Sequence, residues 1–136
     1  MADFKNLKIL DLEFTRVSSL SALADLDGLE FLSVFRTPVS DASALAKMSN
    51  LGYLRLSGTQ VSDMNPLVGL TSLRKLYFGD TPVSDLTPVM RMTWLTHVNV
   101  EKTLANENAR RLPTITSVVR ASHCPSRHKL RRSIRP

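Results

Sequence analysis

The feature that most constrains this chain is a 22-residue repeat that runs through most of its 136 residues. Three apolar columns keep this spacing: Leu7, Leu29, Leu51, Leu73 and Leu95; Leu10, Leu32, Leu54, Leu76 and Val98; and Leu12, Val34, Leu56, Phe78 and Val100. A threonine column (Thr15, Thr37, Thr59, Thr81, Thr103) and a valine column (Val17, Val39, Val61, Val83) follow. A coil this short cannot enclose its own apolar edge, so the coils must stack on one another.

The repeating unit reads L-x-x-L-x-L-x-x-T-x-V-S-D-hydrophobic-x-x-L-x-x-L-x-x. This pattern resembles the leucine-rich repeat family, and in particular its short 22-residue class, which occurs in phosphatase regulatory subunits, internalins and protozoan proteins. The resemblance is close over residues 7–103 and loose over residues 1–124. It implies an α/β fold, a right-handed solenoid with a parallel β-sheet on its concave side.

The residue pattern supports this architecture independently. The L-x-L alternation predicts a strand in which Leu10 and Leu12 face the interior, whereas Ile9 and Asp11 face outward. On the convex side, a column of favoured helix N-caps precedes a column rich in proline and then an apolar column, which predicts one short helical or 3-10 turn per coil. The N-cap column holds Ser21, Ser43, Asn65 and Thr87.

These features divide the chain into four segments. We expect a partial coil over residues 1–6, five repeats over residues 7–115, a degenerate sixth strand over residues 116–124 and a basic tail over residues 125–136. In the sixth strand, Thr116, Val119, Ala121 and Cys124 are matched to the columns that begin with Leu7, Leu10, Leu12 and Thr15. A helix over Glu107–Leu112, capped by Asn106, is expected before it.

The N-terminal edge of the solenoid is expected to be open. Phe4 stands in the register of Leu26, so residues 1–6 match the end of a preceding coil. We expect the first coil to expose Leu10, Leu12 and Leu20, together with an unpaired strand edge. This predicts self-association, a covering partner or a preceding coil.

The outward strand positions form the candidate binding surface. Aromatic and cationic side chains occupy neighbouring positions there, and such side chains are frequent in binding hot spots. The candidate partner-binding residues are Phe31, Phe35, Tyr53, Arg55, Lys75, Tyr77 and His97. The alternative interpretation is that these side chains only stabilise the sheet by stacking between strands.

Two polar columns are interpreted as structural. The threonine hydroxyls are expected to bond the backbone of the turn that leaves the strand. Asp41, Asp63 and Asp85 could form a Ca²⁺ ladder, but their V-S-D context favours capping of backbone N–H groups. Trp94 is expected either to pack over the edge of the interior or to form a lateral contact.

No residue pattern indicates catalysis. Cys124 and His123 are neighbours on the expected sixth strand and so point to opposite faces. Metal-ligand spacing, a phosphate-binding glycine loop and a nucleophile elbow are all missing. The sequence therefore predicts no enzyme, no cofactor, no metal site and no small-molecule substrate.

The charge is concentrated in the C-terminal part. Residues 1–103 hold ten Lys and Arg against eleven Asp and Glu, whereas residues 104–136 hold eight against one. The candidate polyanion-binding residues of the tail are Arg127, Lys129, Arg131, Arg132 and Arg135. Such a run can bind nucleic acid, an anionic membrane or an acidic protein, act as a nuclear address, or be a solvated terminus.

These observations define two functional hypotheses. The first is a non-catalytic protein–protein interaction module, or scaffold, that binds a partner on its concave aromatic and basic face. The alternative is a structural component of a ribonucleoprotein or chromatin assembly that is anchored by the basic tail. No apolar run approaches the ~20 residues of a membrane span. A single cysteine and the lack of a signal-like start favour the cytoplasm, with the nucleus as the other compartment.

Overall fold

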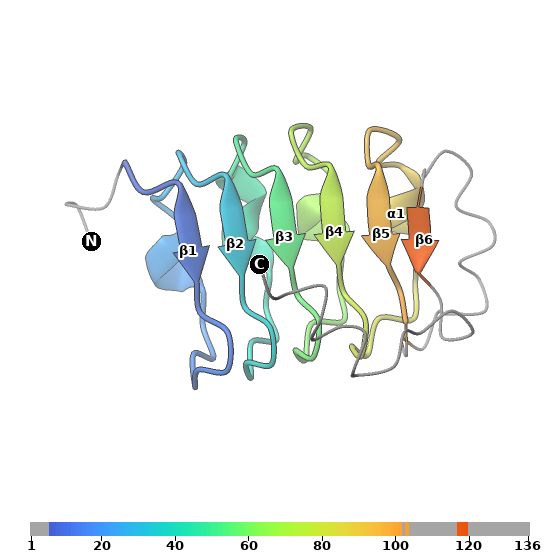
Figure 1. The fold of residues 1–136 in the computed structure, drawn as a ribbon, viewed down its shortest axis with the longest axis horizontal. Coiled ribbons are helices and arrows are strands. Elements are labelled where there is room, and N and C mark those ends of the chain that lie inside the picture. Colours follow the sequence, from blue (N-terminus) through green and yellow to red (C-terminus); the bar gives the residue numbers. More distant parts are fainter. Residues whose placement is uncertain (1–5, 102, 104–116, 120–136) are drawn as a thin grey trace, which may run out of the picture.

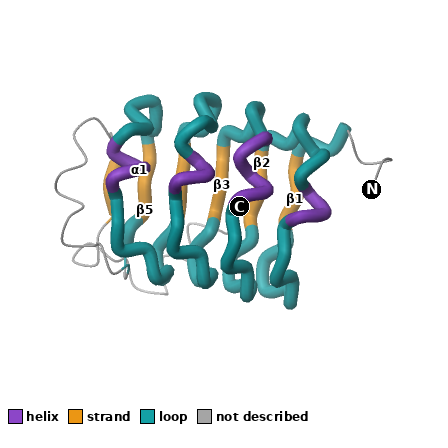
Figure 2. The backbone as a smooth tube through the Cα atoms, turned by 180° about the vertical axis from the view of Figure 1, so that it is seen from behind, coloured by secondary structure: helices purple, strands orange, loops and turns teal. Residues whose placement is uncertain are grey.

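The computed structural model describes residues 6–101, 103 and 117–119, which form a stack of coils with a parallel sheet along one side (Figure 1). The six strands follow the chain order β1 to β6: Ile9–Asp11, Phe31–Ser33, Tyr53–Arg55, Lys75–Tyr77, His97–Asn99 and Ser117–Val119. Short helical turns line the opposite side (Figure 2). The predicted solenoid with a parallel sheet and 3-10 turns is confirmed. None of the helices in this part of the chain is long and apolar enough to cross a membrane.

The register of the sheet follows the repeat. Residues 22 positions apart pair from β1 to β5, so Leu10 lies opposite Leu32, and Leu32 lies opposite Leu54. The interior columns are almost fully buried from coil 2 onward. The outward side chains of these strands form what we call the sheet face, which the sequence predicts as the concave side.

The register of β6 differs from the prediction by one residue. Val98 pairs with Val118, not with Val119. The prediction matched Thr116 and Ala121 to leucine positions, and such weak matches cannot fix a register. A shift of one residue exchanges the two faces of a strand. Residues 1–5 of the expected partial coil, the helix at 107–112, Cys124 and the tail lie outside the described residues.

The helical turns are η2 (Ser21–Leu23), η3 (Ser43–Lys47), η4 (Asn65–Leu67) and α1 (Thr87–Met90). The predicted N-cap column is wrong by one position, because its residues begin the helices. The N-cap positions are apolar and form no side-chain cap; they hold Leu20, Ala42, Met64 and Leu86.

The aspartates of the V-S-D motif cap the turns instead. Each carboxylate accepts the backbone N–H two residues later at 2.9 Å, in the pairs Asp41 with Ser43, Asp63 with Asn65 and Asp85 with Thr87. The prediction that these carboxylates cap turns is confirmed. The backbone bond from Ser43 lowers the pKa of Asp41, and the side-chain and backbone bonds from Thr87 lower the pKa of Asp85.

The threonine column bonds the backbone as predicted. Four hydroxyls are buried, and each donates to the carbonyl oxygen three residues earlier. The donors and distances are Thr37 at 2.8 Å, Thr59 at 2.6 Å, Thr81 at 2.6 Å and Thr103 at 2.8 Å. Each hydroxyl fixes the turn that leaves a strand.

Replacing Thr59 by valine is expected to lower the free energy of unfolding by about 1–2 kcal/mol. Valine keeps the shape of the side chain but removes the donor to the Leu56 carbonyl in a buried turn. Urea unfolding measures the difference, with the exposed Thr71→Val as the control. A neutral result at Thr59 would mean that the column serves packing alone.

A column of left-handed residues follows the strands and was not predicted. Phe14, Arg36, Gly58 and Asp80 have φ of 59°, 54°, 73° and 55°. Each N–H donates to a carbonyl of the next coil, at 2.6–3.0 Å. This conformation is unfavourable for residues with a Cβ, by about 1 kcal/mol or more. The lateral bonds hold it in place.

The first coil is less buried than the others. Leu7, Leu10, Leu12 and Val17 are only partly buried against the core. Leu20, however, is 1% exposed, so the expectation that it is exposed is wrong. Its column lies at the starts of the helices and faces the continuous core, where the following coil covers it.

Candidate functional site

Three aromatic rings stack across neighbouring coils on the sheet face. Phe31 and Tyr53 are register partners on β2 and β3, and their rings are nearly parallel with centroids 4.4 Å apart. Tyr77 on β4 continues the row, with its centroid 5.2 Å from that of Tyr53. Parallel strands lie ~4.8 Å apart, which suits ring stacking. Because the rings face one another along the solenoid, the ring edges and the tyrosine hydroxyls remain available for contacts with other molecules.

A second aromatic group lies just past the ends of β1 and β2. The guanidinium of Arg55 lies 3.9 Å from the ring centroid of Phe35, and that of Arg36 lies 5.5 Å from it. Phe14 packs edge-on against Phe35, with centroids 5.3 Å apart. Arginine over an aromatic face is a favourable arrangement that also orders the guanidinium.

A polar link joins the first three coils. Arg55 Nη1 lies 3.0 Å from Glu13 Oε1, and the Ser33 hydroxyl donates to the same oxygen at 2.6 Å. Ser33 is buried, although its column was expected to face outward. The ion pair is partly shielded, since its side chains are 28% and 26% exposed. Glu13 therefore positions Arg55 over Phe35.

The structure places most, but not all, of the predicted site residues in aromatic or cation–π contacts. Phe31, Tyr53 and Tyr77 stack on one another, and Arg55 lies over Phe35, so five of the predicted residues fall into two contacting groups. Lys75 is exposed on β4 and lies in register between Tyr53 and His97. His97 is half-buried, with its Nδ1 2.9 Å from the Thr96 hydroxyl. Neither Lys75 nor His97 joins the aromatic contacts within the described coils.

Three residues of this surface were not predicted as site residues. They are Ile9, Glu13 and Phe14. Ile9 and Phe14 are 67% and 69% exposed, the large exposed hydrophobic side chains of the described part of the chain. Ile9 and Glu13 stand in the outward columns, so the repeat could have included them. Phe14 belongs to the left-handed column, which no apolar pattern reveals.

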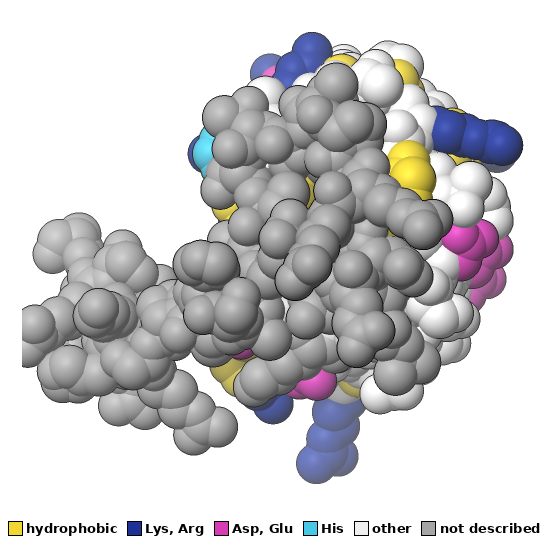
Figure 3. Space-filling view, turned by 90° about the vertical axis from the view of Figure 1, so that its right-hand side faces the viewer, with side chains coloured by type: hydrophobic (Ala, Val, Ile, Leu, Met, Phe, Trp, Pro, Cys, Tyr) yellow, Lys and Arg dark blue, Asp and Glu magenta, His cyan; other side chains and the backbone are white. Residues whose placement is uncertain are grey.

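Over β1 to β5, the sheet face carries no excess of positive charge. The outward strand columns hold Asp11, Glu13 and Glu101 against Arg55 and Lys75, and the Arg55 charge is paired with Glu13. Seen from the β6 end, the described Lys and Arg side chains project singly from several sides of the solenoid (Figure 3). Burial raises the pKa of the Tyr53 phenol, which stays a hydrogen-bond donor at neutral pH.

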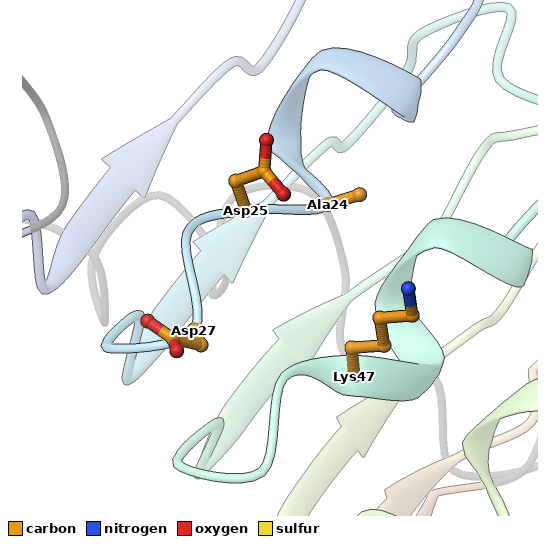
Figure 4. Close-up of a pocket in the computed structure, with 4 residues that line it drawn as sticks. All are labelled: Ala24, Asp25, Asp27 and Lys47. Atoms are coloured by element: carbon orange, nitrogen blue, oxygen red, sulfur yellow. The ribbon is translucent and has the colours of Figure 1, made fainter. Parts of the chain in front are cut away.

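The helical side carries a hollow between η2 and η3. Ala24, Asp25, Asp27 and Lys47 line it, and the two carboxylates point in different directions (Figure 4). Its charged side chains are exposed. Among residues 6–101, 103 and 117–119, no group of three or more His, Cys, Asp or Glu could hold a metal ion.

The structure also decides the role of Trp94. Its indole N–H donates to the Leu70 carbonyl of the preceding coil at 2.9 Å, and its ring packs against the core. Trp94 therefore closes the edge of the interior, which is one of the two roles that the sequence left open.

The repeat columns, the parallel sheet and the similarity to solved structures show that the chain has the leucine-rich repeat fold. It is similar to internalin C2 of Listeria monocytogenes, with 29% identity and a TM-score of 0.79 over 88% of this chain and 54% of that one. No family model and no curated protein matches the sequence. Membership of the short 22-residue class stays a prediction.

Two further structures share the fold at lower identity. Internalin inlF of Listeria monocytogenes is 22% identical, with a TM-score of 0.63 over 87% of this chain and 42% of that one. A leucine-rich repeat protein of Leptospira interrogans is 16% identical, with a TM-score of 0.70 over 85% and 38%. The chain thus spans about half the length of these proteins, or less.

Proposed function

We propose that this chain is a non-catalytic protein–protein interaction module that binds its partner on the sheet face. The observation that carries the proposal is the aromatic row over three consecutive coils, with Arg55 held over Phe35 beside it. The proposed contact residues are Phe31, Phe35, Tyr53, Arg55, Lys75, Tyr77 and His97. A cytoplasmic location, with the nucleus as the alternative, stays a prediction.

The preordered contacts support binding on physical grounds. Stacked rings and a paired arginine have already lost side-chain freedom, so a partner would not have to order them. Stacking alone would explain the row as a stabiliser of the sheet. It does not explain Ile9 and Phe14, which remain largely exposed at the N-terminal end of the same surface.

Replacing both Tyr53 and Arg55 by alanine is expected to weaken partner binding by at least about a hundredfold. The change removes the middle ring of the row and uncovers Phe35. Affinity for a partner isolated with the unaltered chain is the measurement. The variant Lys47→Ala with Arg91→Ala, which changes two exposed cations on the helical side, is the control.

The fold of each variant is checked by circular dichroism and thermal unfolding, since Arg55→Ala leaves Glu13 without its ion-pair partner. Tyr53→Ala alone leaves this ion pair in place and is measured beside the double variant. Normal binding by the folded double variant would show that the sheet face is not the binding surface.

The segregation of charge supports a second candidate, a component of a ribonucleoprotein or chromatin assembly anchored by the tail. The tail holds five Lys and Arg and no acid. If all five contact phosphates of duplex DNA, the log–log dependence of affinity on salt has a slope of about −4.5. Replacing all five by glutamine is expected to abolish this dependence. A salt-independent affinity of the unaltered chain would contradict the anchor.

A further inference from the structure

We propose that Phe14, Phe35 and Arg36, which we call the edge cluster, form a subsite for a partner segment in which an acidic side chain stands near a large apolar one. This inference rests on the proposed function and narrows the chemistry of the partner. The edge cluster lies just past the carboxyl ends of β1 (Ile9–Asp11) and β2 (Phe31–Ser33), beside the aromatic row.

The first argument is that folding does not account for a phenylalanine at position 14. The fold requires a left-handed residue there, and Gly58 and Asp80 meet the same requirement in later coils. A bulky side chain adopts this conformation at a cost, whereas glycine or asparagine does so readily. Phe14 is nevertheless 69% exposed, and its edge contact with Phe35 fixes where the ring points. Its apolar surface is therefore ordered but uncovered.

The second argument is the charge of Arg36. Its guanidinium lies 5.5 Å from the centroid of Phe35. Its stem crosses Gly58, where a Cβ would come within 2.9 Å of Arg36 Cγ. In the described part of the chain, Lys8 and Arg55 pair with Glu30 and Glu13, but no carboxylate lies within ion-pair distance of Arg36. An exposed cation held beside an aromatic ring is suited to a carboxylate.

The neighbouring residues limit where an acidic side chain can bind. Glu13 is already engaged by Arg55 and Ser33, so it leaves Arg36 available. Asp80 stands in the column of Arg36 two coils further on, where it would repel a second acid. Phe14 and Arg36 belong to adjacent coils, about 4.8 Å apart, and side chains two positions apart share one face of an extended segment and can reach both. The acid is thus assigned to coil 2 and the apolar side chain to coil 1.

A library of random peptides displayed on phage, selected on the full chain, tests this subsite. Enriched peptides are expected to carry Asp or Glu two positions from Phe, Trp, Leu or Met. The affinity of a synthetic peptide of that sequence is expected to fall about tenfold with Arg36→Gln and about tenfold with Phe14→Asn. Arg91→Gln removes an exposed arginine from the helical side, and affinity should stay within about twofold of the unaltered chain.

The Phe14→Asn variant separates binding from folding. Asparagine suits the left-handed conformation, so its unfolding temperature should equal or exceed that of the unaltered chain. Two results would overturn the subsite and leave the proposed function standing. In the first, the enriched peptides lack an acidic residue. In the second, Arg36→Gln and Phe14→Asn leave peptide affinity unchanged, whereas Tyr53→Ala abolishes binding. Peptides that bind every variant alike, Tyr53→Ala included, or no retained peptide at all, would overturn both.

Discussion

Replacing Phe78 by alanine is expected to lower the free energy of unfolding by about 3–5 kcal/mol. Phe78 is fully buried and is the largest side chain of the solenoid interior. It stands in a column whose other members are leucine or valine, so its ring fills more of the interior of coil 4 than the equivalent side chain fills in the other coils. Urea unfolding followed by circular dichroism measures the loss.

The stacked architecture leads to a second expected result for Phe78→Ala. Most contacts in a repeat stack join neighbouring coils, so a cavity in coil 4 weakens mainly its contacts with coils 3 and 5. Amide hydrogens of β5 should therefore exchange faster than those of β2. Phe78→Leu, which restores the common residue of the column, should cost less than about 1.5 kcal/mol. Equal losses for the two variants would contradict the cavity explanation.

The interior of this fold could be predicted from the sequence because one period determines it. A residue that recurs at the same place in every coil faces the same environment, so Leu10, Leu32 and Leu54 had to share the interior. The aspartate caps and threonine bonds were predictable for the same reason, since each depends on contacts within two or three residues.

The period alone could not reveal features in which the coils differ. The Glu13–Arg55 pair joins residues 42 positions apart in the chain and crosses coil 2 to do so. Nothing in the columns indicates that Glu13 would contact Arg55 and not another cation. The N-caps were misplaced by one residue because Ser, Asn and Thr are favoured caps in general, whereas here Asp41 and its equivalents already satisfy the N–H groups.

The left-handed column was missed for a different reason. Sequence rules associate positive φ with glycine, but only Gly58 follows that rule among the four described members of the column. Phe14, Arg36 and Asp80 adopt the conformation because lateral bonds to the next coil hold it, with Phe14 bonded to the Phe35 carbonyl at 2.9 Å. The edge cluster could consequently not be predicted from residue types.

Replacing Gly79 by alanine is expected to lower the free energy of unfolding by about 2–3 kcal/mol. Gly79 is buried, and an added Cβ would overlap Asn99 Oδ1 and lie 2.8 Å from the Glu101 carbonyl oxygen. Neither atom can move freely. The Asn99 oxygen accepts the Glu101 N–H, and the Glu101 carbonyl accepts the Asp80 N–H at 2.6 Å. A side chain here would therefore separate coils 4 and 5 on the sheet face.

The same substitution at Gly69 supplies the control. An added Cβ there meets no atom within 4 Å, and φ lies outside the left-handed range. Gly69→Ala should therefore raise the free energy of unfolding by about 0.5 kcal/mol, since alanine reduces the entropy of the unfolded chain. Opposite signs for one chemical change would show that close approach of the coils, and not backbone freedom, keeps glycine at position 79. A stabilising Gly79→Ala would refute that explanation, because the added methyl group could then be accommodated without separating coils 4 and 5.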